Sequence, residues 1–363
     1  MNSTHELSTL VEALMGLHHS PGTVAALATL TRTRGSTFRR PGTHMLVMGD
    51  GSVVCELSGG CPQRDIVARA QEVMANGETR LVRYDSESGL DVLMEMGCGG
   101  ELEVLIEPLT APHALDFAGS LLHCLEARQP ARLATFFALD GSPVTPRRQL
   151  STARETVFDA LADPALSKAV AAATAAQAAS TATVVSLSTP HGVADVLIES
   201  ADPRHALVVV GSSAAALALL PVASALGWQT TLVDHDPERL RALQLPARLH
   251  AICATPDQLI GAISLDQHSS VVVMTHNLER DLAYLAALSD APVAYVGALG
   301  SRERATRMRS NPQLDRLQLH APAGLDIGSE TPQEIALAVA AEIMAVINRR
   351  GGGPLRDNEG TIH

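Results

Sequence analysis

Residues 206–216 read ALVVVGSSAAA, and this stretch decides the fold class of the second half of the chain. Its continuous apolar start is typical of a strand buried on both faces of a parallel sheet, and Gly211 opens the turn that follows. The alanine-rich segment 214–226 then predicts a helix, and residues 230–233 predict a second strand. This order of elements predicts a βαβ unit within a Rossmann-like, doubly wound parallel sheet.

The predicted strands of this sheet are followed by polar or glycine-rich residues. Residues 271–274 precede Thr275-His276-Asn277, and residues 293–296 precede a glycine-rich turn. Because ligands of doubly wound sheets bind at the carboxyl ends of the strands, we expect a ligand site at this edge. The site residues expected there are Gly211, Asp234, His276, Gly297, Gly300, Ser301 and Arg302.

The turn after the first of these strands carries an incomplete dinucleotide fingerprint. The complete pattern is Gly-x-Gly-x-x-Gly, and Ser213 and Ala216 stand where its second and third glycines would be. Asp234 follows at about 20 residues, the distance expected for an acidic residue that binds a ribose. Two interpretations remain open: a site for NAD(P), or a Rossmann-like fold that binds no nucleotide.

A cluster of arginines marks the first half of the chain. Residues 34–42 read RGSTFRRPG, and residues 44–48 and 52–57 behind them predict a hairpin turned by Gly49-Asp50-Gly51. Glycines beside arginines let backbone amides and guanidinium groups converge on a phosphate or another oxyanion. The residues expected to do so are Arg34, Gly35, Ser36, Arg39 and Arg40.

Two cysteines in this half are enclosed by glycines. Cys61 follows Ser58-Gly59-Gly60 and precedes Pro62, the expected first residue of a helix that ends at Asn76-Gly77. A cysteine at a helix N-terminus lies where the helix dipole lowers the pKa of a thiol. The second cysteine is Cys98, enclosed by Gly97, Gly99 and Gly100 and followed by an alternating, strand-like segment. Cysteine is also a common small buried residue, so a purely structural role for both stays open.

The length and composition allow two domains. The chain has 363 residues, of which 46% are hydrophobic and 2% aromatic. We expect an N-terminal α+β domain over residues 1–202, a Rossmann-like domain over 203–350 and a polar tail over 351–363. The alanine-rich segment 153–180 predicts a helix, with a lid or a mobile linker as alternatives.

Charge and cysteine usage exclude several classes of protein. The net charge of −12 argues against general binding of nucleic acid. Five cysteines without a Cys-x-x-Cys pair indicate reduced thiols, and no signal peptide is visible, so we expect a cytoplasmic protein. Residues 205–233 contain no Asp, Glu, Lys or Arg, but glycine and proline interrupt them, so we expect a buried βαβ unit and no membrane span.

Five motifs, in this order along residues 20–350, resemble the XdhC/CoxI family of maturation factors for xanthine dehydrogenase and related molybdenum hydroxylases. They are Ser58-Gly59-Gly60-Cys61, Gly97-Cys98-Gly99-Gly100, Thr275-His276-Asn277, residues 295–302 (YVGALGSR) and residues 324–328 (GLDIG). The resemblance implies an accessory protein, not an enzyme. It also implies an N-terminal domain followed by a Rossmann-like one.

This resemblance implies a cofactor and partners. The protein would bind molybdenum cofactor in its molybdopterin form, protect it while a cysteine desulfurase supplies a terminal sulfido ligand, and insert it into an apo molybdenum hydroxylase. Cys61 or Cys98 could contact the molybdenum, because thiolates suit soft metal centres. A homodimer is also expected.

Two other functions stay open. An NAD(P)-dependent oxidoreductase would use Gly211 and Asp234 for the dinucleotide and Cys61 or His276 for chemistry. A redox-regulated interaction protein would use Cys61 and Cys98 as a thiol switch.

Overall fold

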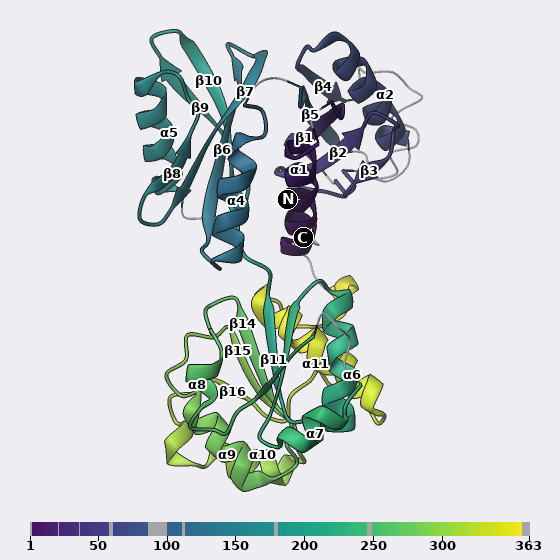
Figure 1. Cartoon of the computed structure of the whole chain (residues 1–363), viewed down its shortest axis with the longest axis vertical. Helices are drawn as coiled ribbons and strands as arrows, with labels where there is room; N and C mark the ends of the chain where they lie inside the picture. The colour runs from purple at the N-terminus through teal and green to yellow at the C-terminus, as the bar shows by residue number, and fades with distance from the viewer. Residues whose placement is uncertain are drawn as a thin grey trace. The chain divides into compact units, whose positions relative to one another are not determined.

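The computed structural model describes residues 2–20, 22–35, 37–57, 61–85, 100–110, 113–177, 181–244 and 249–357, without the side chain of Cys61. The chain divides into two compact units, Met1–Pro203 and Arg204–His363, which are described separately (Figure 1). Within the described ranges, no helix is long and apolar enough to cross a membrane.

The first unit begins with an antiparallel sheet in the order β3-β2-β1-β5-β4. The strands are β1 (Ala25–Arg34), β2 (Thr43–Met48), β3 (Val53–Val54), β4 (Arg80–Tyr84) and β5 (Glu101–Pro108). Pairing of β2 with β3 confirms the hairpin predicted on either side of Gly49-Asp50-Gly51.

Successive residues of β1 serve two cores, because side chains of a strand alternate between its faces. Ala26, Ala28 and Leu30 pack with α2 (Cys61–Asn76) on one face. Ala25 and Leu27 pack with α1 (Thr4–His18) and α4 (Asp116–Glu126) on the other. Both faces of the central strand are therefore covered.

A second antiparallel sheet in this unit has the order β8-β7-β6-β10-β9, with α5 (Pro164–Ala176) packed on it (Figure 1). Its strands are β6 (Ala131–Leu139), β7 (Ser142–Thr152), β8 (Thr156–Asp159), β9 (Thr183–Thr189) and β10 (Gly192–Ala201). Pairs of acidic and basic side chains join the two sheets. The pairs are Arg32 with Asp195 at 2.8 Å, His44 with Glu199 at 2.8 Å, and Arg148 with Glu107.

Residues 153–180 differ from the predicted single helix, because 156–159 form β8 and, among those that the structure describes, only 164–176 are helical. The sequence contains no clear signal for β7 either, because this strand includes Pro143 and Pro146. These prolines are tolerated because β8 pairs with β7 only from Gln149 onward, so their half of β7 is bonded on one side.

The second unit contains a six-stranded sheet in the order β13-β12-β11-β14-β15-β16, with every pair parallel. The strands are β11 (Ala206–Val210), β12 (Gln229–Asp234), β13 (His250–Cys253), β14 (Ser269–Val273), β15 (Tyr295–Ala298) and β16 (Leu319–His320). The helices are α6 (Ala214–Ala225), α7 (Pro237–Ala242), α8 (Leu259–Ala262), α9 (Leu278–Ala287), α10 (Arg302–Arg309) and α11 (Pro332–Ile347).

Helices cover both faces of this parallel sheet (Figure 1). One core joins Val209 of β11 to α6 and α11, and the other joins Val208 to α9 and α10. The predicted fold class is therefore confirmed: an α+β region precedes a doubly wound, Rossmann-like sheet. A capping box begins α11, since Thr331 and Glu334 bond each other's backbone amides, as their spacing in the sequence predicts.

Candidate functional site

One edge of the first sheet collects the ends of three strands. Arg34 ends β1 and lies opposite Glu101, which begins β5; Tyr84 ends β4 and lies opposite Leu102. We call this the loop edge, defined by Arg34, Tyr84 and Glu101. The arginine loop, residues 35–42, leaves from it, and Gly100 enters it. The second glycine-enclosed cysteine motif therefore joins the described structure beside Arg34.

The first turn of α2 is bonded to the same edge. The Tyr84 hydroxyl donates to Asp65 Oδ2 at 2.7 Å, and Arg69 Nε donates to the same oxygen at 2.6 Å. Burial and the bond to Asp65 raise the pKa of Tyr84. Because α2 begins at Cys61, the backbone of this cysteine lies one helical turn, about 5–6 Å, from Asp65.

The arginine loop is held by defined contacts. Arg39 donates to both carboxylate oxygens of Glu6, at 2.8 and 3.2 Å. Glu6 also belongs to the capping box of α1 with Ser3. Burial alone would raise the pKa of Glu6, but the hydrogen bonds from Arg39 and Ser3 outweigh it and lower the pKa. Arg34 and Arg40 are exposed and Arg39 is half-buried, so the three predicted arginines differ in exposure.

The opposite end of the loop is packed tightly. Gly42 has φ +77°, and a Cβ there would lie 2.7 Å from Ala182 Cβ and 2.9 Å from Glu199 Oε2. Glu199 accepts from His44 Nε2, and the His44 amide donates to Asn2 Oδ1 at 2.7 Å. The loop therefore starts at the loop edge and ends against the second sheet.

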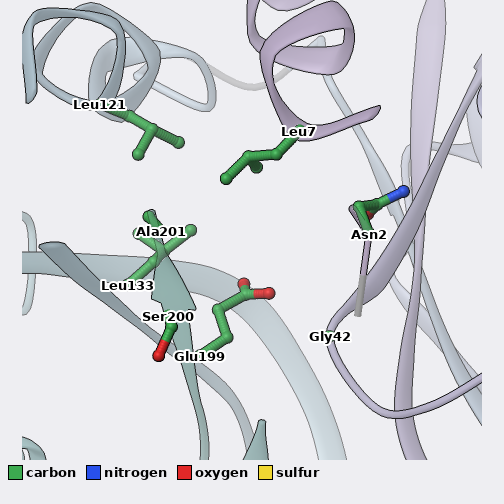
Figure 2. A pocket seen from close by; sticks show the side chains of 8 residues that line it. All are labelled: Asn2, Leu7, Gly42, Leu121, Leu133, Glu199, Ser200 and Ala201. Atoms are coloured by element: carbon green, nitrogen blue, oxygen red, sulfur yellow. The ribbon is translucent and has the colours of Figure 1, made fainter. Parts of the chain in front are cut away.

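A small pocket lies beside this end of the loop (Figure 2). Its lining residues are Asn2, Leu7, Gly42, Leu121, Leu133, Glu199, Ser200 and Ala201. The polar groups of Asn2 and Glu199 are already bonded to His44, so we assign the pocket a structural role.

Gln63, in the first turn of α2, was not predicted as a site residue. Its Oε1 is buried and has no hydrogen-bond partner among the described residues. An unpaired buried carbonyl costs free energy, about 1–3 kcal/mol, unless a ligand or water donates to it. Gln63 is therefore a candidate acceptor for an N–H group, two residues after Cys61.

Three described cysteines lie outside the two motifs. Two of them have raised pKa values, which leave little thiolate at neutral pH, and the third lies in the second unit. Burial, with a smaller contribution from Glu6, raises the pKa of Cys55 to about 11. Burial raises the pKa of Cys124, which is 1% exposed in α4. Cys253 is exposed at the end of β13 in the second unit. Cys55 has φ +64° and follows β3, although a strand position was predicted for it.

The carboxyl edge of the parallel sheet holds the second group of predicted residues. Gly211 has φ +103°, and a Cβ there would lie 2.7 Å from the Met274 carbonyl oxygen. Asp234, 2% exposed, accepts from Ser212 Oγ at 2.7 Å and pairs with His235 Nδ1 at 2.9 Å. The carboxylate expected to bind a ribose is thus bonded to its own neighbours.

Arg304 connects the last two turns of this edge. It donates to the His276 carbonyl oxygen at 3.1 Å and to Asp281 Oδ2 at 2.6 Å, and Asp281 is fully buried. Asp281 also accepts from the backbone amide and hydroxyl of Thr275. His276 itself has φ +60° and is exposed. The network fixes the backbone that presents its imidazole.

The glycine-rich turn at residues 297–302 completes this edge. A Cβ at Gly297 would meet the Tyr295 ring at 2.6 Å, and one at Gly300 would meet Arg304 Cδ at 2.9 Å. Ser301 caps α10 by accepting from the Arg304 amide at 3.2 Å, and Arg302 is exposed. The turn therefore needs its glycines for packing.

The predicted site residues fall into two groups. Arg34, Gly35, Arg39, Arg40, Gly100 and the backbone of Cys61 belong to the first unit, and the residues from Gly211 to Arg302 belong to the second. Ser36, Ser58, Gly59, Gly60, Gly97, Cys98 and Gly99 lie outside the described residues. Over the described ranges, no group of three His, Cys, Asp or Glu residues is arranged to hold a metal ion.

Two family models match separate parts of the chain. The model of the XdhC and CoxI family matches residues 18–85, and the model of the XdhC Rossmann domain matches residues 207–343. The chain belongs to the XdhC and CoxI family. The family models therefore cover α2, the arginine loop and the parallel sheet of this XdhC protein.

Full-length relatives support this assignment. The chain is 26% identical over 329 residues to a probable xanthine dehydrogenase subunit of Bacillus subtilis, covering 90% of this chain and 94% of that one. It is 25% identical over 343 residues to the molybdenum cofactor insertion chaperone PaoD of Escherichia coli, covering 93% and 86%. A crystal structure of a xanthine dehydrogenase from Bacillus halodurans aligns with a TM-score of 0.76 at 23% identity, covering 99% and 98%, which supports the fold of this XdhC protein.

Proposed function

We propose that this protein binds molybdenum cofactor as cargo and inserts it into an apo molybdenum hydroxylase such as a xanthine dehydrogenase. The membership of the family and the likeness to a cofactor insertion chaperone support this proposal. A binding and transfer role, not catalysis, is the activity we assign.

The observation that carries the proposal is the convergence at the loop edge. Tyr84 bonds the first turn of α2, which begins at Cys61, while Glu101 lies opposite Arg34 and follows Gly100. Cys98 is two residues before Gly100, and two residues span at most about 7 Å. This connectivity supports a site in which both cysteine motifs reach one cargo molecule.

The residues at this edge suit the parts of the cofactor. Arg34 and Arg40, both exposed, would contact the cofactor phosphate. Backbone amides of the same loop, at Gly35 and Ser36, would add to this contact. The unpaired Gln63 Oε1 suits an N–H donor of the pterin. Cys61 and Cys98 would contact the molybdenum or its sulfur, because thiolates are soft ligands.

Two transient partners complete the proposal. A cysteine desulfurase would supply the terminal sulfido ligand while the cofactor is held, and the apo-hydroxylase would then receive it. The protein would act in the cytoplasm as a homodimer. The protein can be purified from its native host while the hydroxylase is being matured. If it then carried neither partner, the proposal of these two partners would be contradicted.

Metal and pterin analysis tests the central claim. Protein purified from cells that make the cofactor should carry molybdenum and pterin in equal amounts. A matched preparation from cells that cannot make the cofactor should carry neither. Protein from cofactor-producing cells that lacks both would refute the proposal.

The second unit favours one alternative, a site for NAD(P). Its supporting observation is the turn at Gly211 leading into α6, with Asp234 at the end of the neighbouring strand. The bond from Ser212 to Asp234 would have to open for a ribose to bind. A rise in melting temperature on addition of NAD or NADP, absent in Asp234→Asn, would support this alternative.

A further inference from the structure

Phe38 is exposed in a way that the fold does not require. Its side chain is 67% exposed, the largest fraction among the exposed large hydrophobic residues of the described chain. The sequence contains only five phenylalanines. Burying a phenylalanine contributes about 1.5–3 kcal/mol, so leaving one in water forgoes that stabilisation.

The ring is held in place from one side. Arg39 Cζ lies 5.9 Å from the centroid of the Phe38 ring. Arg39 is fixed in turn by its two hydrogen bonds to Glu6 of α1 and by the Thr37 hydroxyl, which donates to its carbonyl oxygen at 2.8 Å. An exposed ring with a cation beside one face is preorganised to receive a second flat group on its open side.

The surroundings of Phe38 argue against a protein partner as its occupant. Contiguous exposed apolar patches of several hundred Å² are the usual mark of a protein-binding surface. The described residues next to Phe38 in the loop are mostly polar or charged, namely Thr37, Arg39 and Arg40, with Gly35 and Pro41 farther along. An isolated aromatic ring among arginines is the arrangement that stacks heteroaromatic rings bearing an anionic group.

We infer that Phe38 is a stacking platform for the planar pyrimidine ring of a pterin. The inference rests on the proposed function and names a contact residue for it. The exposed guanidinium of Arg34, at the start of the same loop, would contact the anionic group of that ligand.

Titration of the full chain with a free oxidised pterin, followed by the pterin's own fluorescence, tests this inference. Phe38→Ala and Phe38→Leu should weaken pterin binding about tenfold or more, because loss of a stacked aromatic ring costs about 1–3 kcal/mol. Phe38→Trp should bind within about threefold of the parent, since an indole stacks equally well. Val193→Ala, at another exposed apolar residue of the first unit, should leave the affinity unchanged.

Three results would overturn the inference. Equal pterin affinity in Phe38→Ala and the parent would exclude Phe38 as a contact. If Phe38→Leu bound pterin as tightly as the parent, the contact would be a simple apolar one and not aromatic stacking. Loss of hydroxylase binding in Phe38→Ala, with pterin binding retained, would assign the ring to a protein interface. These outcomes leave the proposed function standing, whereas a parent protein that binds neither pterin nor isolated cofactor refutes both.

Discussion

Arg34, the last residue of β1, lies directly opposite Glu101, the first residue of β5. The pairing joins the arginine loop to the segment that carries Cys98, although the two are separated by the hairpin, α2 and β4 in the sequence. Substitutions in the arginine loop and in the Cys98 motif should therefore affect binding of the same ligand at the loop edge.

Replacement of Cys61 or Cys98 by Ala should reduce retained molybdenum and pterin and activation of the hydroxylase, with little change in melting temperature. The reason is that each change removes a proposed soft ligand without altering the described core. Cofactor content of the purified variants is the measurement. Cys253→Ala is the control, because this exposed cysteine lies in the other unit. Full retention by both variants would move the site to the carboxyl edge of the second unit.

Tyr84→Phe should lower the free energy of unfolding by about 1.5–3 kcal/mol, since it removes one hydrogen bond to a carboxylate. It should also lower cofactor retention, because Asp65 then no longer ties the first turn of α2 to β4. Denaturant unfolding and metal analysis measure the two effects. Arg80→Ala breaks an exposed pair with Glu72 at the other end of β4 and serves as the control. If Tyr84→Phe lost stability but retained cofactor, the contact between Tyr84 and Asp65 would be purely structural.

Gly42→Ala should destabilise the first unit by about 2–5 kcal/mol, the sum of a left-handed backbone penalty and overpacking. The new Cβ would lie 2.7 Å from Ala182 Cβ. Gly77→Ala is a matched control, with φ +73° and no atom within 4 Å of its Cβ, and should cost only the backbone penalty, about 1–2 kcal/mol. Equal effects in denaturant unfolding would mean that the contact with Ala182 does not constrain the loop.

Acid should weaken the tie between α1 and the arginine loop. The pKa of Glu6 in the folded protein lies below its ordinary value of 4.5. The pair with Arg39 therefore contributes stability that is fully present above pH 4.5 and is lost as the pH falls through the lower, folded pKa. The melting temperature of Glu6→Gln should accordingly approach that of the parent as the pH falls through this range. If the melting temperatures of Glu6→Gln and the parent differed by the same amount at every pH, the effect would come from packing and not from the ion pair.

Residues 203–350, expressed alone, should fold cooperatively. The division of the chain at Pro203 and the complete parallel sheet after it motivate this expectation. Circular dichroism during thermal unfolding is the measurement. A disordered fragment would show that the second unit needs the first, and that residues 1–202 and 203–350 are not independent domains.

The sequence by itself determined the parallel sheet and the residues that lie at the carboxyl ends of its strands. The apolar run before Gly211 and the regular alternation of strands and helices depend on local periodicity, which is visible in the chain. It also determined α2 and the capping box of α11, because capping uses residues three apart. The motifs that carry the family membership are likewise local.

Only the tertiary structure decided which distant residues meet. Strand β7 of the second sheet was missed because it contains two prolines, whose tolerance depends on how far the short β8 extends. The bond from Tyr84 to Asp65, the commitment of Arg39 to Glu6 and the exposure of Phe38 have no local signal. Each depends on strand register and on the packing of α1 and α2, which bring together groups far apart in the sequence.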